Sequence, residues 1–294
     1  MKTKAIVTLS IVIVIVLIAV IFSGINDPDN SVNNGGGCSH DTTQIKITQE
    51  KPLNISIYLD LSDRIKSQTY SENNLNQMDK DTAIVAFLAA VVKKRAEKQR
   101  IVACKDKIKV FFYPAPNDSK IALLSDHLEM DLSTTKAQDK KKVLMAFEDD
   151  FKTSLEQIYH STIQSNQWPG SDIWGFFKKP IDTYCIKEDS RNVLVILTDG
   201  YIYYQPNRIQ KGDSTNYILQ QTLRNPKSAL IPARNDLDDL EVLFLELNPN
   251  PPTDQTKMEE VISEWLKAMG VKKFYVGETD LPSNTKMIIE KFLK

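Results

Sequence analysis

The stretch Asn54–Arg64 reads Asn-Ile-Ser-Ile-Tyr-Leu-Asp-Leu-Ser-Asp-Arg. Its first half is apolar and rich in β-branched residues, which predicts a buried strand over about Leu53–Leu59. The strand runs directly into the oxygen-bearing side chains of Asp60, Ser62 and Asp63. Because open α/β sheets bind their ligands at the carboxyl ends of their strands, this junction is the first candidate for a functional site.

A second stretch of the same kind lies much later in the chain. Arg191–Gly200 reads Arg-Asn-Val-Leu-Val-Ile-Leu-Thr-Asp-Gly, a buried-strand pattern that ends on Asp199 before a turn glycine. The carboxyl ends of parallel strands meet at one edge of a sheet. Two buried strands with acidic ends therefore imply one shared site.

The chain after Lys51 alternates between strand and helix patterns. Further strands are expected at about 107–113, 240–247 and 272–276, and a short return strand at about 120–124 completes a hairpin. Helices are expected at about 79–100, 136–164, 171–184, 217–224, 253–270 and 283–293, with Asp81 as a plausible N-cap of the first. The pattern predicts an α/β, Rossmann-like fold with a largely parallel central sheet, an antiparallel edge strand and helices on both faces.

The N-terminal segment differs from the rest in composition. Ala5–Phe22 is almost wholly apolar, and about 18 residues of helix come close to the hydrocarbon thickness of a bilayer. This length favours a retained membrane anchor over a cleaved signal peptide, whose apolar core is shorter. The expected organisation is a basic cytoplasmic end at 1–4, a transmembrane anchor or uncleaved signal at 5–23, a flexible linker at 24–50 and one domain at 51–294.

Charges on either side of the apolar segment predict its orientation. Lys2 and Lys4 precede it, and Asp27 and Asp29 follow it. Because positive residues favour the cytoplasmic side, the N-terminus is expected in the cytoplasm. The main domain of this single-pass membrane protein would then lie outside the cytoplasm, in a bacterial envelope.

The overall composition excludes several classes of protein. The 294 residues are 41% hydrophobic and 26% charged, with a formal net charge of −1. This balance gives no electrostatic argument for nucleic acid as a partner. The three cysteines, Cys38, Cys104 and Cys185, form no disulfide framework and no zinc-ligand spacing. A bond between Cys104 and Cys185 stays open for an exported domain.

Three short segments resemble the metal loops of the von Willebrand factor type A domain. Asp60-Leu-Ser-Asp-Arg64 is similar to that family's Asp-x-Ser-x-Ser loop after the first strand, Gly170–Ile173 to its second loop, and Leu197–Gly200 to its third. The resemblance covers about 51–294 and implies the fold of that family. It also implies a metal-ion-dependent adhesion site, with Asp60, Ser62, Ser171 and Asp199 as the ligands.

The cation that the resemblance implies is Mg²⁺, which prefers oxygen ligands and keeps several waters. One departure matters, because Arg64 occupies the position of the second serine of the first loop. Arginine cannot bind a cation. Its side chain could turn outward, or it could pair with Asp60 or Asp199 and fill the space of the metal. Without metal, the two acids would be turn residues held by hydrogen bonds and by Arg64.

The resemblance implies a membrane-tethered module that binds or assembles with a protein partner, which the sequence leaves unidentified. Tyr201, Tyr203 and Tyr204 follow Asp199 closely and suit the rim of such an interface, where tyrosine is enriched. The alternative is a Mg²⁺-dependent hydrolase or phosphotransfer enzyme of an α/β fold. No phosphate-binding loop of the Gly-x-x-x-x-Gly-Lys-Ser/Thr type and no Gly-x-Ser-x-Gly elbow occurs, so no catalytic residue is assigned.

Overall fold

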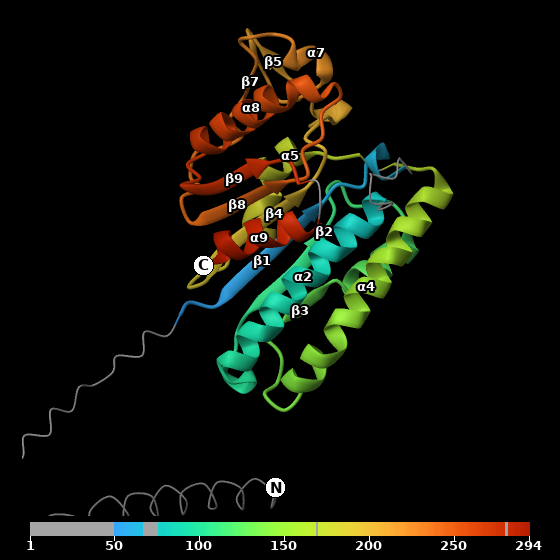
Figure 1. Ribbon diagram of the computed structural model, residues 1–294, viewed down its shortest axis with the longest axis vertical. Helices are drawn as coiled ribbons and strands as arrows, with labels where there is room; N and C mark the ends of the chain where they lie inside the picture. Colours follow the sequence, from blue (N-terminus) through green and yellow to red (C-terminus); the bar gives the residue numbers. More distant parts are fainter. Residues whose placement is uncertain (1–49, 67–75, 169, 280–281) are drawn as a thin grey trace, which may run out of the picture. The chain divides into compact units, whose positions relative to one another are not determined.

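Six strands form the central sheet of the protein in the order β3-β2-β1-β4-β8-β9 (Figure 1). The structure is a computed structural model that describes residues 50–66, 76–168, 170–279 and 282–294. All neighbouring strands of this sheet are parallel except β3, which runs antiparallel to β2 at one edge. The strands are β1 (Leu53–Leu59), β2 (Lys107–Phe111), β3 (Glu129–Asp131), β4 (Arg191–Leu197), β8 (Leu240–Leu245) and β9 (Lys273–Gly277).

Helices cover both faces of the sheet, which confirms the expected α/β, Rossmann-like fold. Side chains alternate between the faces of a strand, so Ile57 and Leu59 of β1 join one hydrophobic cluster and Tyr58 joins the other. The first cluster includes buried residues of α2 (Gln77–Lys98), α3 (Ser119–Asp126), α4 (Lys140–Ser165) and α9 (Pro282–Leu293). The second includes those of α5 (Ile173–Lys178), α6 (Pro180–Cys185), α7 (Gln220–Leu223) and α8 (Gln255–Ala268).

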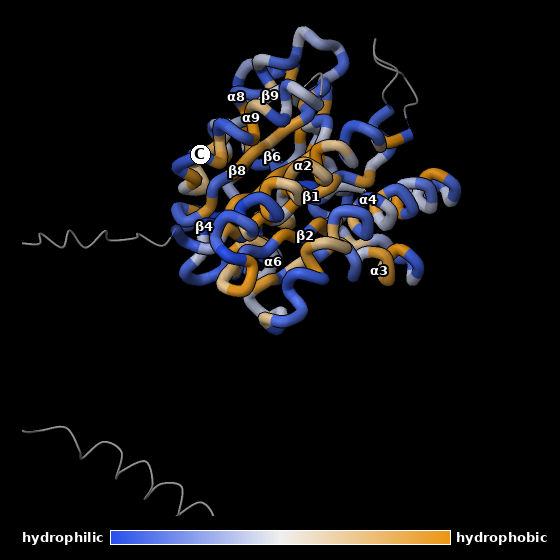
Figure 2. The backbone as a smooth tube through the Cα atoms, turned by 60° about the horizontal axis from the view of Figure 1, so that its bottom comes forward, coloured by the Kyte–Doolittle hydropathy of each residue, from blue (hydrophilic) through white to orange (hydrophobic). Residues whose placement is uncertain are grey.

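The hydrophobic residues are concentrated along the central strands, as Figure 2 shows for β1, β2 and β8. Both clusters consist of residues between Leu53 and Leu293. Residues Gln49–Lys294 form one compact unit. This unit therefore contains a complete core of its own, which is the usual condition for independent folding.

Minor elements complete the chain between β4 and α8. A small sheet has the order β5-β6-β7. Its strands are β5 (Gln210–Lys211), β6 (Ser214–Thr215) and β7 (Ala229–Leu230). Single turns of 3-10 helix are η1 (Asp63–Lys66), η2 (Ile101–Ala103), η3 (Gln205–Asn207) and η4 (Pro252–Asp254).

The expected hairpin strand at 120–124 is wrong, because these residues lie in helix α3. The Asp118 side chain accepts hydrogen bonds from the backbone N–H groups of Lys120 and Ile121, which starts a helix directly after the turn. The antiparallel return strand is instead β3, a few residues later. The edge strand was therefore expected correctly, but in the wrong segment.

Two helix boundaries also differ from the expectation. Helix α2 begins at Gln77, and its N-cap is Asn76, whose side chain accepts a hydrogen bond from the N–H of Asp79. Asp81 is consequently one turn inside the helix and is fully buried. The helix expected over 171–184 is divided into α5 and α6 by Pro180, which occupies the first turn of α6.

The expected membrane anchor at 5–23, with its flanks at 1–4 and 24–49, lies outside the described residues. Within the part of the chain that is described, no helix is long and apolar enough to cross a membrane. The long helices α2 and α4 instead bury their apolar side chains against the sheet. As far as the described residues go, this finding contradicts the prediction of a single-pass membrane protein with its main domain outside the cytoplasm.

Candidate functional site

Asp60 lies at the carboxyl end of β1 and joins two loops. The pairing of β1 with β4 sets Leu59 opposite Leu197, and the N–H of Asp60 donates to the carbonyl of Leu197 at 3.1 Å. Oδ1 of Asp60 accepts a hydrogen bond from the backbone N–H of Ser62 at 2.7 Å. Oδ2 accepts one from the Thr198 hydroxyl at 2.7 Å. The buried carboxylate therefore holds its own loop against the end of β4.

Asp199 follows Thr198, and the charge of Asp60 affects its pKa. Its Oδ1 accepts a hydrogen bond from the N–H of Tyr201 at 3.1 Å. Among the described residues, no group donates a hydrogen bond to Oδ2 of Asp199. Burial and then the nearby Asp60 carboxylate raise the pKa of Asp199 to about 6. Two acids from adjacent strands thus face the same edge of the sheet.

Ser171 reaches this region but its hydroxyl is already engaged. The residue forms an isolated β-bridge with Tyr203, next to a second bridge between Leu61 and Gly170. Its Oγ lies 3.1 Å from the hydroxyl of Tyr58, which also lies 2.6 Å from the carbonyl of Tyr113. Because a carbonyl can only accept, Tyr58 donates its single proton there and Ser171 donates to Tyr58.

Asp172, next to Ser171, has a structural role. Its side chain accepts a hydrogen bond from the N–H of Gly175 at 2.9 Å and so caps helix α5. Burial raises the pKa of this carboxyl group above its ordinary value. In the second loop of the expected metal site, the Asp172 side chain is therefore engaged in local hydrogen bonds.

Arg64 points into the protein, toward α2 and the end of β8, and not toward Asp199. Its Nε donates to the backbone carbonyl of Asp60 at 2.9 Å and lies 4.0 Å from the carboxylate oxygen Oδ2. Its Nη2 lies 2.7 Å from Asp81, and its Nη1 lies 3.4 Å from Glu246. Only 4% of the side chain is exposed. Of the expected alternatives, the pairing with Asp60 is present, but the main partners are two acids that had not been assigned to the site.

Two more side chains complete the surroundings of Arg64. Gln77 donates to Asp81 at 2.9 Å and to Glu246 at 2.6 Å. The hydroxyl of Tyr159 donates to Asp81. We call the five residues Arg64, Gln77, Asp81, Tyr159 and Glu246 the Arg64 cluster. They come from the loop after β1, from α2, from α4 and from the end of β8.

The Arg64 cluster was missed at the sequence level for identifiable reasons. Asp81 was interpreted as a helix cap, and Glu246 was interpreted as part of a strand end. The available signal was the apolar sequence nearby, because Asp81 stands just before a run of apolar residues and Glu246 interrupts one. A buried acid needs a partner, which is a reason to search the chain for a buried cation.

The oxygen atoms at the strand ends differ in how well they suit a cation. Mg²⁺ is often held by one or two carboxylates and waters, and Asp60 and Asp199 supply two carboxylates. Ser62 is half-buried, and no hydrogen bond to its hydroxyl is found among the described residues. Ser171 donates its proton to Tyr58 and keeps the lone pairs of its Oγ. All four side chains, Asp60, Ser62, Ser171 and Asp199, therefore carry oxygen ligands of the type that Mg²⁺ prefers.

The described ranges contain no group of three or more His, Cys, Asp or Glu side chains that could hold a metal ion. Asp60 and Asp199 are a pair, so a cation here would depend on hydroxyl and water oxygens for its remaining ligands. The magnesium ion stays a prediction.

The three tyrosines after Asp199 have different environments. The hydroxyl of Tyr201 accepts a hydrogen bond from the N–H of Asn250 at 2.9 Å, so this side chain ties its loop to the segment after β8. Tyr203 is 38% exposed, and Tyr204 is half-buried. Tyr203 is the tyrosine that offers most surface to a partner.

The cysteines of the domain are free thiols. Cys104 and Cys185 are both buried and are not joined to each other. Burial raises the pKa of each thiol. A disulfide between them is therefore not part of the structure.

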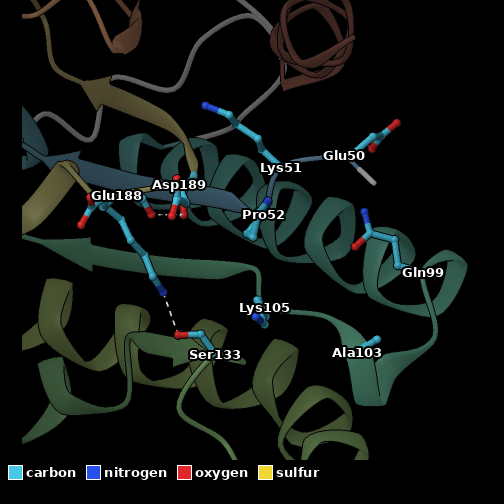
Figure 3. A pocket seen from close by; sticks show the side chains of 11 residues that line it. Glu50, Lys51, Pro52, Gln99, Ala103, Lys105, Ser133, Glu188 and Asp189 are labelled. Carbon is cyan, nitrogen blue, oxygen red and sulfur yellow. Dashed lines mark hydrogen bonds between the residues drawn. The ribbon is translucent and has the colours of Figure 1, made fainter. Parts of the chain in front are cut away.

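A polar hollow of about 440 Å³ lies at the opposite, amino edge of the sheet (Figure 3). Pro52 and Ser190, which precede β1 and β4, both line it. Basic and acidic side chains are balanced there: Lys51, Lys105 and Lys187 against Glu50, Glu188 and Asp189. This hollow is thus separate from the acidic ends of the strands, and its charge selects no sign of ligand.

Comparisons with known proteins leave the family open. No protein-family model matches the chain, and no curated protein matches it. One solved structure that it resembles is the pilus adhesin SpaC from Lactobacillus rhamnosus GG, at 10% sequence identity and a TM-score of 0.41. The match covers 83% of this chain and 30% of the adhesin. A likeness of this size carries no argument about function.

Proposed function

We propose that the domain at 49–294 is a protein-binding module of the von Willebrand factor type A kind, which contacts its partner through the carboxyl ends of β1 and β4. Asp60, Ser62 and Asp199 would hold a Mg²⁺ ion there. When bound, the ion would offer a coordination position to a carboxylate of the partner.

One observation carries this proposal. Asp60 and Asp199 lie at the ends of adjacent parallel strands, while Arg64 is shared between Asp60, at 4.0 Å, and the buried acids Asp81 and Glu246. The acids at this edge are consequently left with too little positive charge. A divalent cation supplies that charge and also favours an acidic partner over a basic one.

The shape of the surrounding loops supports a binding surface. Tyr203 is partly exposed beside Ser171, and tyrosine is enriched where proteins meet. Tyr201 anchors its loop to Asn250 and keeps the surface ordered. Ordered loops lower the entropic cost of binding a partner.

Calorimetric titration of Mg²⁺, and then of Mn²⁺, into the fragment 49–294 tests the proposal. We expect saturable binding by the wild type and about tenfold or greater loss of affinity in Asp199→Ala, because one of two carboxylate ligands is removed. Asp213→Ala is the matched control, since Asp213 is an exposed acid far along the same loop region. Equal affinity in both variants, or no binding by the wild type, would overturn the metal site.

The same samples separate the binding module from the alternative of a Mg²⁺-dependent hydrolase. Turnover of a phosphoester such as p-nitrophenyl phosphate by the wild type, abolished in Asp60→Asn, would establish the enzyme. A module that only binds is expected to release no product above the level of the Asp60→Asn control.

A further inference from the structure

Three buried acids surround the one positive charge of Arg64: Asp81 and Glu246 of the Arg64 cluster, and Asp60 beside it. Asp60, Asp81 and Glu246 are at most 7% exposed, and all three lie within 4.0 Å of the guanidinium. If every acid were ionised, the group would carry two unpaired negative charges. Unpaired buried charge is strongly unfavourable, so one or more of the acids must retain a proton.

Glu246 has a carboxyl group whose surroundings favour the protonated form. Burial is the main cause that raises its pKa well above the ordinary value of 4.5, and the charge of Asp81 and a hydrogen bond with Asp81 raise it further. Arg64 opposes this shift but does not outweigh it. Arg64 contacts both acids, at 2.7 Å from Asp81 and 3.4 Å from Glu246.

Glu246 combines an unusual backbone conformation with side-chain contacts to two other elements. Its φ of 71° lies in the left-handed region, which residues other than glycine rarely adopt without support from their surroundings. The support comes from Gln77 and Arg64, which both bind Oε2 of Glu246. The end of β8 is thereby joined to α2 and to the loop after β1.

Arg64 also closes the loop that carries the candidate ligands. The N–H of Ser62 binds the Asp60 side chain, and the N–H of Ile65 donates to the carbonyl of Ser62 at 3.3 Å. Nε of Arg64 returns to the carbonyl of Asp60. The five-residue turn from Asp60 to Arg64 is therefore held internally, and its far end is attached to the Arg64 cluster.

We propose that Arg64 is a positioning residue that locks the turn 60–64 onto α2 and β8 through its contacts with Asp81 and Glu246. The proposal rests on the proposed function, because the turn carries the candidate ligands Asp60 and Ser62. It adds to that site a residue that holds the ligand-bearing turn in place without binding the cation itself.

A charge-balanced variant tests the lock without changing the net charge around Arg64. Arg64→Met together with Asp81→Asn removes one positive and one negative charge, and pairs replaced in this way usually preserve the fold. Arg191→Met together with Glu241→Gln is the matched control, because it removes a side-chain ion pair at the amino edge of the sheet. Both double variants are made in the fragment 49–294, whose core is complete.

Amide hydrogen exchange is the first measurement, in the absence of metal. We expect exchange at residues 61–65 to become about tenfold faster in the Arg64/Asp81 variant, because the turn opens locally. The Arg191/Glu241 variant should leave this segment unchanged. Equal exchange of the segment in the wild type and in the Arg64/Asp81 variant would overturn the proposal.

Mg²⁺ titration of the same variants is the second measurement. We expect about tenfold weaker binding by the Arg64/Asp81 variant, as for other residues that orient metal ligands. Faster exchange in the Arg64/Asp81 variant, together with no Mg²⁺ binding by the wild type, would support the lock and overturn the proposed function. Unchanged Mg²⁺ affinity in the Arg64/Asp81 variant would remove the lock and leave the function standing.

The proton on Glu246 is tested through the pH dependence of stability. Charged and titratable groups face it from every element packed against it. These are Asp60 and Arg64 in the turn, Lys80 and Asp81 in α2, and Tyr159 in α4.

When the pKa of an acid is higher in the folded protein than in the unfolded chain, the protonated acid stabilises the fold. This stabilisation is complete at a pH below the pKa of the unfolded chain and is lost as pH rises through the pKa of the folded protein. Glu246→Gln mimics the protonated acid and escapes that loss. The melting temperature of this variant minus that of the wild type should therefore rise steadily as pH rises above about 4.5.

Glu260→Gln, at an exposed position of α8, is the control and should show no such rise. A difference between Glu246→Gln and the wild type that stays flat or falls as pH rises would contradict a protonated Glu246.

Discussion

Arg64 and Arg191 show how the same side chain behaves at opposite edges of one sheet. Arg191 begins β4, and two of its nitrogens lie 2.8 Å from the two carboxylate oxygens of Glu241. Its remaining nitrogen donates to the carbonyl of Leu293 at 2.6 Å. Arg64 follows β1 and divides its nitrogens among three acids. Arg191 thus pairs with one acid, whereas Arg64 is shared by three acids.

The two neighbouring glutamates respond in opposite directions. Burial alone would raise the pKa of Glu241, but hydrogen bonds from Arg191 and Lys273 outweigh it and hold the pKa below its ordinary value. Burial raises the pKa of Glu246, and Arg64 cannot compensate because Asp81 adds a second negative charge. The effect of an arginine on the pKa of a nearby acid therefore depends on the other charges around that acid and on the access of water.

The largest expected effect comes from breaking the Arg64 cluster on one side only. Arg64→Ala leaves Asp81 as a buried charge without a cation, and breaking a buried pair in this way costs about 3–5 kcal/mol of stability. Urea unfolding of the fragment 49–294 measures the loss. A cost below that of Arg191→Ala would show that the comparison between the two arginines is wrong.

A smaller effect is expected from Tyr159→Phe. The change removes the hydroxyl that donates to Asp81 but preserves the ring in the core. Loss of a buried hydrogen bond to a charged group costs about 2 kcal/mol, which the same unfolding experiment resolves. Tyr275→Phe, a half-buried tyrosine of β9, serves as the control for the loss of a hydroxyl group. Equal costs for the two changes would mean that Asp81 gains nothing from Tyr159.

The smallest of the three effects is expected from Arg191→Ala. Its side chain is 26% exposed and that of Glu241 is 22% exposed, so water takes over part of the lost interaction. Partly exposed ion pairs contribute about 1 kcal/mol or less. The difference from wild type should shrink as salt is added, because salt screens accessible charges. A loss independent of salt would point to the hydrogen bond with Leu293 as its source.

The sequence alone predicted the architecture because the hydrophobic pattern of a strand or helix lies in residues that are close together along the chain. The apolar runs that end at Leu59 and Leu197 form the two central strands, and their acidic ends therefore had to share one edge of a parallel sheet. The return strand was the exception. Residues 120–124 are as apolar as a short strand, but the Asp118 cap made them a helix.

Only the tertiary structure decided which charges share a buried space. Arg64 meets Asp81 from 17 residues away and Glu246 from 182 residues away, and no local pattern encodes so long a separation. Asp81 looked like a helix cap, since an acid near a helix start is ordinarily stabilised there. Burial by α4 and β8 changed its role. An ionic interaction depends on the nearest partners and on the exclusion of water, and both are properties of the folded chain alone.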